Sequence, residues 1–311
     1  MSRFKPILCR KTLSTFLLLT FFLLSAQEEP FDWTKADELF PGIRHVFLKT
    51  DRPRPLRINV ILVDLKRSDL RFMTVKRDPD WGKPMPDYPS YLIRVRRLTV
   101  WKFMDNALRQ GIDMLVAVNA TPWGPWKPPY THSYAAKMGL VISDGDKIEE
   151  ANGRPVFLIT DKNEFQIRKI ARGEDTSGIR LALAGFAMIL ENGHVVKGRP
   201  KLGPRTAYGL SEDAGKMIIM TVDGRMKGFS EGVSTPELGE WMRKFGAFNA
   251  LNMDGGGSTT LLVSDGRGGS RRLTANPFYR TVATSLGIYR AKGEKVLHPA
   301  PPKNVPAVGN R

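Results

Sequence analysis

The stretch Asn252-Met253-Asp254-Gly255-Gly256-Gly257-Ser258-Thr259-Thr260 is the most informative part of this chain. The segments 248–251 before it and 261–263 after it indicate two short buried strands. Glycines between strands lose more backbone entropy on folding than other residues and add no side chain to the core. Such a loop is expected where the main chain must come close to another group; a flexible surface turn is the alternative.

The residues of this loop combine an acid, bare backbone and hydroxyls. Successive glycine N–H groups can form a concavity that binds anions. Asp254 is a candidate nucleophile or general base at one end, and Ser258 and Thr259 offer hydroxyls at the other. The loop is not a nucleotide P-loop, because no lysine follows the glycines. An aspartate that only caps the turn is the alternative interpretation.

Strand-like segments outnumber helix-like segments in the rest of the chain. Helical patterns cover 98–108 and a segment that Thr235 is expected to cap, with Pro236 at its first position and Gly246 at its end. The Asp144-Gly145 turn predicts a hairpin between 139–142 and 155–159. We therefore expect an α+β fold, with a mixed, mostly antiparallel β-sheet covered by a few α-helices. The other strands are expected at 56–65, 70–75, 114–118, 165–170, 187–190, 194–196, 205–210, 216–222 and 281–289.

The two ends of the chain differ from its middle. Residues 1–26 show the basic, apolar and small-residue segments of a signal peptide. We expect an N-terminal lead-in over 27–55, one large domain over 56–291 and a disordered Pro-rich tail over 292–311. The protein is thus expected to be exported to the periplasm or the extracellular space. An uncleaved N-terminal anchor is the alternative.

Composition excludes several kinds of chemistry. The only cysteine, Cys9, lies in the signal peptide, so the mature chain has no disulfide, thiolate metal site or cysteine nucleophile. No pair of histidines has zinc-ligand spacing. We expect no required cofactor, with calcium near Asp254 and Asp223 as an alternative. The net charge of +17 favours a phosphorylated glycan or, more loosely, an anionic membrane surface. Export argues against nucleic acid as a partner.

Several motifs match a known family in order and spacing. They are Arg205-Thr206, the segments 222–225 and 230–238, and most specifically Gly246–Thr260. Through them the chain resembles the phosphodiester glycosidase family over roughly 56–289. The resemblance implies hydrolysis of a sugar linked through its anomeric carbon to a phosphodiester. The loop Thr121–Trp126 departs from the family's usual small residues and aromatic pair, which leaves the sugar and the leaving group open.

That reaction assigns roles to the candidate residues. Cleavage at the anomeric carbon needs a nucleophile or an activated water, and the leaving phosphate needs charge stabilisation. Asp254 is the first candidate, Arg205 the phosphate clamp, and Asp223 or Glu231 a second carboxylate, although Asp223 also fits a simple turn. The candidate substrate contacts are polar groups at strand ends, the glycine loop and a loop tryptophan: Asn119, Asn252, Gly255, Gly256, Gly257, Ser258, Thr259, Thr206 and Trp123.

Two other functions fit the same residues. A non-catalytic periplasmic glycan-binding or exopolysaccharide-assembly protein would keep the pocket without the chemistry, and the charge and the tryptophan-rich loop favour it. A metal-dependent phosphodiesterase would cut the P–O bond instead of the C–O bond.

Overall fold

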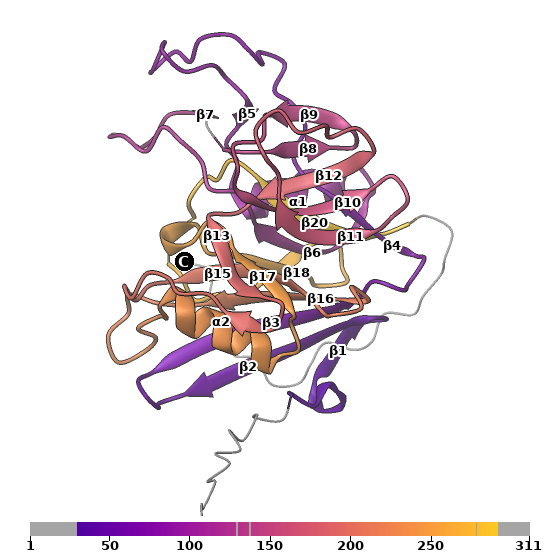
Figure 1. The fold of residues 1–311 in the computed structure, drawn as a ribbon, viewed down its shortest axis with the longest axis vertical. Coiled ribbons are helices and arrows are strands. Elements are labelled where there is room, and N and C mark those ends of the chain that lie inside the picture. Colours follow the sequence, from indigo (N-terminus) through magenta and orange to yellow (C-terminus); the bar gives the residue numbers. More distant parts are fainter. Residues whose placement is uncertain (1–29, 129, 137, 278, 292–311) are drawn as a thin grey trace, which may run out of the picture.

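The computed structural model describes residues 30–291 except 129, 137 and 278 (Figure 1). The expected signal peptide over 1–26 and the expected tail over 292–311 therefore lie outside the described residues. Within the described range, no helix is long and apolar enough to cross a membrane.

An eight-stranded sheet forms the base of the molecule in the view of Figure 1. Each strand in it is antiparallel to its neighbours. In spatial order the strands are β1 (Asp37–Phe40), β2 (Ile43–Thr50), β3 (Leu56–Asp64), β16 (Lys216–Val222), β15 (Arg205–Leu210), β17 (Asn249–Asn252), β13 (Ala187–Glu191) and β14 (His194–Val195).

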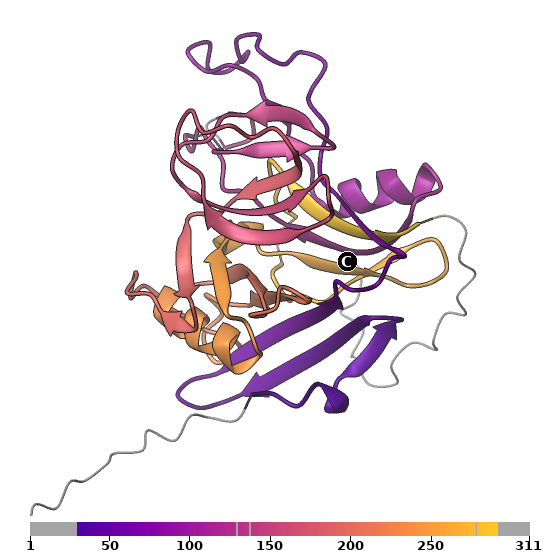
Figure 2. The same ribbon diagram turned by 45° about the vertical axis from the view of Figure 1, so that its right-hand side comes forward.

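Two five-stranded sheets and a two-stranded ribbon, also antiparallel, complete the described strands (Figure 2). One sheet has the order β11 (Phe165–Lys169), β10 (Pro155–Thr160), β12 (Ile179–Ala184), β8 (Val141–Ser143) and β9 (Asp146–Glu149). The other has the order β19 (Ser270–Arg272), β18 (Leu261–Ser264), β6 (Asp113–Asn119), β20 (Ser285–Arg290) and β4 (Leu70–Met73). The ribbon pairs β5 (Val95–Arg96) with β7 (Tyr134–Ala135).

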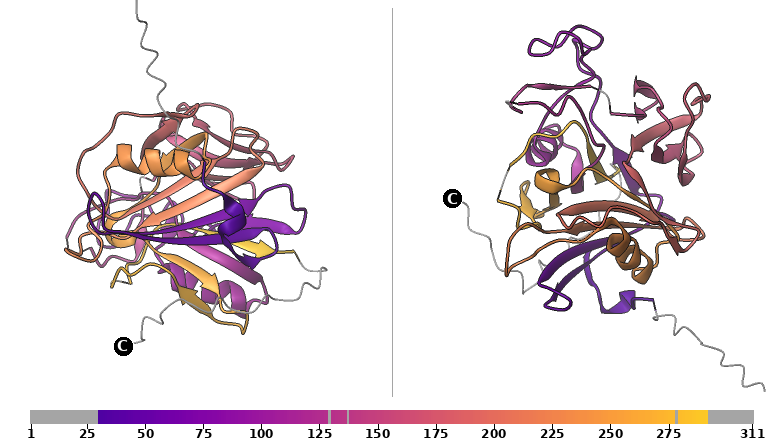
Figure 3. Two further views of the ribbon diagram at one scale, coloured as in Figure 1. Left: turned by 90° about the horizontal axis from the view of Figure 1, so that it is seen from below. Right: turned by 60° about the vertical axis from the view of Figure 1, so that its left-hand side comes forward.

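The eight-stranded sheet is buried on both faces, and its strands alternate between them as a period of two residues requires. Ile61 and Val63 of β3 face the main core, which the three sheets share. Val60 and Leu62 face a second core under helix α2 (Thr235–Lys244), shown against this sheet in Figure 3. These two cores hold the strand ends of the sheet in fixed positions.

The structure corrects the predicted fold in several places. The sheets are mostly antiparallel as expected, but the described residues contain only α2 and α1 (Val100–Arg109) as α-helices, so the fold is mostly β. The expected lead-in over 27–55 includes β1 and β2, because β2 pairs with β3 and β1 pairs with β2. The Asp144-Gly145 turn joins β8 to β9 and not to 155–159. Ser234 caps α2 in place of Thr235.

Candidate active site

The candidate site lies where the end of β17 meets the start of β15. These strands are antiparallel neighbours with Ala207 opposite Asn252, so Arg205 and Asp254 follow at the same edge of the sheet. The end of β6 reaches this edge from another sheet, and the Tyr208 hydroxyl donates to the main-chain carbonyl of Asn119 at 2.8 Å. Three sheet segments that are distant in sequence thus converge on one loop.

Asn119 connects these segments through its buried side-chain amide. Its Nδ2 donates to the Asp254 carbonyl at 2.7 Å, and its Oδ1 accepts from Thr206 Oγ1 at 2.9 Å and from the Thr260 N–H at 3.0 Å. Asn119 and Thr206 were predicted to contact substrate, but neither lines the cleft described below. Their hydrogen bonds instead position the glycine loop.

We expect Asn119→Ala to lower the free energy of unfolding by about 3 kcal/mol, because it leaves three buried polar groups without a partner. Urea denaturation would measure the loss. Asn106→Ala in α1 is the matched control, since the Asn106 side chain forms no hydrogen bond with another described residue. An equally small change in both variants would show that the network around Asn119 is not important for stability.

A cleft of about 500 Å³ opens beside this loop. The described residues that line it include five basic side chains but only one carboxylate. None of the cations forms an ion pair with a carboxylate among the described residues. The charged lining residues are Asp254, Arg199, Lys201, Arg205, Arg225 and Arg280. The neutral lining residues are Trp123, Trp126, Phe186, Leu202, Gly203, Pro204, Asn252, Gly255, Gly256 and Ser258.

The two carboxylate oxygens of Asp254 differ in their hydrogen bonds. Its Oδ1 accepts from the Gly255 N–H at 3.0 Å. Its buried Oδ2 lacks a well-formed hydrogen bond, although the Ser258 and Trp123 side chains lie close enough to act on the carboxylate as donors. Burial raises the pKa of the Asp254 carboxyl to about 6, although Ser258, the Gly255 N–H, Arg280 and Trp123 act in the opposite direction. The group therefore changes its protonation state near neutral pH, which suits an acid, a base or a nucleophile.

Two of the three glycines lie directly against guanidinium groups. A Cβ on Gly257 would lie 2.5 Å from Arg280 Cζ, and one on Gly256 would lie 3.2 Å from both terminal nitrogens of Arg225. Gly256 also has a φ of +63°, which disfavours other residues. The prediction that the main chain comes close to another group is thus confirmed, and the group is a pair of arginines.

Two of the three glycine N–H groups expected to bind an anion are engaged within the protein. The Gly255 N–H donates to Asp254 Oδ1, and the Gly256 N–H donates to the Pro204 carbonyl at 2.9 Å. The short 3-10 helix Gly256–Ser258 engages the Ser258 N–H as well. These N–H groups are therefore not available to an anion, and the arginines that line the cleft are the other donors.

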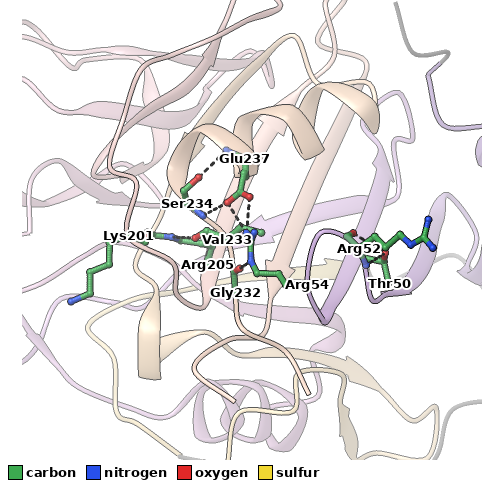
Figure 4. Close-up of polar contacts among 9 residues, drawn as sticks. All are labelled: Thr50, Arg52, Arg54, Lys201, Arg205, Gly232, Val233, Ser234 and Glu237. Carbon is green, nitrogen blue, oxygen red and sulfur yellow. Dashed lines mark hydrogen bonds and ion pairs between the residues drawn. The ribbon is translucent and has the colours of Figure 1, made fainter. Parts of the chain in front are cut away.

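Arg205 reaches the cleft with its guanidinium held in place from behind. Its Nε donates to the Val233 carbonyl at 3.1 Å and its Nη2 to the Lys201 carbonyl at 2.6 Å (Figure 4). Burial lowers the pKa of Arg205, and so do the charges of Arg225 and Arg199. A guanidinium among like charges and without an acidic partner is suited to bind an anion.

The segment that holds Arg205 is itself anchored (Figure 4). Arg54 donates from Nε to the Gly232 carbonyl at 3.0 Å and from Nη2 to both oxygens of Glu237 at 2.7 Å. Glu237 also completes a capping box with Ser234 at the start of α2. The position of Arg205 therefore depends on the rigid end of a helix.

Aromatic side chains form another wall of the cleft. The Trp123 and Trp126 rings meet edge to face at 5.2 Å between centroids, and Arg280 Cζ lies 5.0 Å from the Trp126 centroid. Arg97 Cζ lies 4.2 Å from the centroid of the Trp123 ring. His132 packs against Trp123, and its ring nitrogens contact the Tyr134 and Pro125 carbonyls and Arg97 Nη1, outside the cleft.

Comparison with known proteins identifies the family. The family model described as Phosphodiester glycosidase matches residues 116–289. This chain belongs to the phosphodiester glycosidase family. That match contains Asn119, Arg205, Asp254 and all three glycines, so the site lies inside the part of the chain that defines membership. No curated protein sequence gives a match.

Solved structures share the fold at low sequence identity. The catalytic domain of zebrafish N-acetylglucosamine-1-phosphodiester alpha-N-acetylglucosaminidase, auto-inhibited by its pro-peptide, is 18% identical with a TM-score of 0.54; the match covers 82% of this chain and 86% of that one. A hypothetical protein from Synechocystis is 13% identical with a TM-score of 0.55, covering 81% and 62%. A Burkholderia pseudomallei protein assigned as exported is 14% identical with a TM-score of 0.52, covering 75% and 74%.

Some of the predicted site residues of this family member lie outside the cleft. Asp223 is buried and accepts from the Ala275 N–H at 3.0 and 3.1 Å, and burial raises the pKa of its carboxyl to about 6. Neither Asp223 nor Glu231 lines the cleft, and neither do Gly257 and Thr259. Asp254 is therefore the only carboxylate among the described residues that line it.

Sequence reasoning missed most of the cleft's cations. Arg199, Lys201, Arg225 and Arg280 occur in loops where basic residues are common, and no local pattern distinguishes them from other surface residues. Among the described residues, no three histidine, cysteine, aspartate or glutamate side chains cluster as a metal site would require. The expectations of no required cofactor, and of calcium as an alternative, both stay predictions.

Proposed function

We propose that this family member hydrolyses the glycosidic bond between a sugar's anomeric carbon and a phosphodiester. The supporting observation is that Asp254, the single carboxylate among the described residues that line the cleft, lies in it with Arg205, Arg225 and Arg280. In the reaction, the hydroxyl of water adds to the anomeric carbon, and the bond between that carbon and the bridging phosphate oxygen breaks. The proton of the water goes to the departing phosphate. The products are a free sugar and a phosphate monoester.

The cleft provides what this cleavage requires. Ionised Asp254 attacks the anomeric carbon or removes a proton from the attacking water, and it stabilises the positive charge that develops on the ring. The guanidinium groups offset the charge that accumulates on the departing phosphate. A phosphate monoester leaves with little protonation, so a second carboxylate in the cleft is not essential.

The pH dependence follows from the raised pKa of Asp254. Because the ionised form reacts, kcat/KM should stay level above about pH 7 and fall about tenfold per unit below the pKa of about 6. A profile of kcat/KM from pH 4.5 to 8.5 would measure this. Asp223→Asn is the control, because Asp223 has a similar pKa outside the cleft, and its profile should keep the same acid limb. Activity that rises below pH 6 would contradict this role.

The bond that breaks can be identified directly. A panel of synthetic sugar 1-phosphodiesters should include at least one that wild-type protein hydrolyses. In ¹⁸O-labelled water, the label should then appear in the sugar. Label in the phosphate, together with loss of activity on adding a chelator, would favour a metal-dependent phosphodiesterase. Tight glycan binding without product, unchanged in Asp254→Asn, would favour a binding or assembly protein.

The biological substrate is proposed to be an exported, phosphate-containing glycan. The chain's net charge of +17 would attract such a polyanion, and the Burkholderia pseudomallei neighbour is assigned as exported. A periplasmic or extracellular location follows from this proposal and from the signal peptide expected over 1–26.

A further inference from the structure

The cleft carries more positive charge than one phosphodiester can neutralise. Five basic side chains line it, against one carboxylate, and a phosphodiester has a single negative charge. Like charges gathered without counter-ions destabilise the folded protein, so a surplus of this size indicates a more highly charged ligand. The surplus lies in the cleft itself, separate from the general basic composition of the chain.

The basic side chains reach the cleft from different segments of the chain. Arg205 lies close enough to Arg199 and Arg225 for their charges to act on it. Arg280 lies on the aromatic wall over Trp126, and its charge acts on Asp254. Basic side chains from several segments provide binding positions for more than one anionic group of a ligand.

Exposed apolar side chains lie among these cations. Trp126 is 53% exposed, Phe186 46% and Leu202 38%, and all three line the cleft. Exposed aromatic rings next to hydrogen-bonding groups are suited to stack on the apolar faces of sugar rings. The cleft therefore has contacts for several sugar units as well as for more than one charge.

We propose that the cleft binds a glycan whose sugars are joined by repeated phosphodiesters, and that it contacts at least two of these linkages at once. The scissile linkage lies at Asp254, and the next one lies near Arg199 and Lys201. Sugar rings between and beyond them pack on Trp126 and Phe186. This inference rests on the proposed function and narrows its substrate from a single sugar 1-phosphodiester to a chain.

The test compares two synthetic substrates that differ in one repeat. One carries a single sugar phosphodiester and the other carries two in series. The Arg199→Ala/Lys201→Ala double variant should lower kcat/KM for the longer substrate about tenfold more than for the shorter one. In wild type, kcat/KM should also fall more steeply with salt for the longer substrate. Equal losses for both substrates, with the same salt dependence, would overturn the inference and leave the proposed function intact.

A matched control removes the same charge elsewhere. Lys162 and Arg267 are exposed, lie in turns outside the cleft and form no side-chain hydrogen bond or ion pair with another described residue. The Lys162→Ala/Arg267→Ala double variant should treat the two substrates as wild type does. If this control lost as much kcat/KM on the longer substrate as the Arg199/Lys201 variant does, the overall charge of the protein, and not the cleft, would be what attracts the longer glycan.

Binding measurements keep the inference testable if neither substrate is hydrolysed. In that case the proposed function fails, but titration calorimetry with the same two compounds still shows whether the protein binds the longer compound more tightly than the shorter one. A Kd about tenfold lower for the longer compound, lost in the Arg199/Lys201 variant, would support the two-linkage cleft. Equal affinities would overturn it.

Discussion

Asp254→Asn is expected to lower kcat/KM for a sugar 1-phosphodiester by about 10³-fold or more, equivalent to roughly 4 kcal/mol of transition-state stabilisation. The amide has nearly the same shape but is neither a nucleophile nor a base, and it cannot stabilise positive charge on the sugar ring. No other carboxylate among the described residues lines the cleft to replace it. Steady-state kinetics on the best substrate of the panel would measure the loss.

Asp223→Asn is the matched control for this variant. Asp223 is also a buried carboxyl with a pKa raised to about 6, but its oxygens bind the Ala275 N–H. An asparagine there keeps an acceptor for that N–H, so activity should remain within about tenfold of wild type. If Asp223→Asn instead lost as much activity as Asp254→Asn, the second catalytic carboxylate predicted from the sequence would be correct, and the cleft defined here would be incomplete.

The same Asp254→Asn variant should be more stable than wild type at alkaline pH. The folded-state pKa of about 6 lies above the ordinary value of 3.8, so the native state binds the extra proton. The resulting stabilisation is fully present below about pH 4 and is lost as the pH rises through 6. Asparagine has no charge to bury, so its advantage should grow as the pH rises from about 4 to 6 and then stay level at about 3 kcal/mol. Urea denaturation at pH 4 and pH 8 would measure it.

The sequence contains the local features of this site but not its assembly. Three glycines between two apolar strands predicted a close approach of the main chain, and Gly256 and Gly257 confirm it. What they approach could not be predicted, because Arg225 and Arg280 meet them only through the folding of distant loops. Asn119 looked like a ligand contact because it ends a strand, whereas strand pairing directs its amide into the protein.

For the overall fold as well, local elements could be predicted from the sequence, whereas their assembly could not. Alternating apolar residues predicted most of the strands, since each sheet buries at least one face. The pairing of β8 with β9 was missed because β9 has the sequence Asp-Lys-Ile-Glu and buries only Ile148, so the apolar pattern favoured the next apolar run at 155–159. The two cores needed both faces of the eight-stranded sheet, which no single strand reveals.

Arg280→Ala is expected to lower kcat/KM by about 10²-fold to 10³-fold, the effect usual for removing one group that stabilises transition-state charge. Arg280 is the cation whose charge acts on Asp254, and its guanidinium forms no hydrogen bond with another described residue. It is therefore free to bind the departing phosphate. Arg280→Lys should recover part of the loss, because lysine keeps the charge but not the planar fork that stacks on Trp126.

Gly257→Ala provides an independent approach to the same group. The added methyl would lie 2.5 Å from Arg280 Cζ, so the guanidinium must move while its charge stays in the cleft. Activity should fall in the same direction as in Arg280→Ala but less far, and the Gly257→Ala/Arg280→Ala double variant should be no worse than Arg280→Ala alone. Arg272→Ala is the matched control, since Arg272 stacks on Tyr279 outside the cleft and its loss should change kcat/KM less than about threefold. Additive losses in the double variant would mean that the glycine acts on catalysis independently of Arg280, which the close contact between them does not allow.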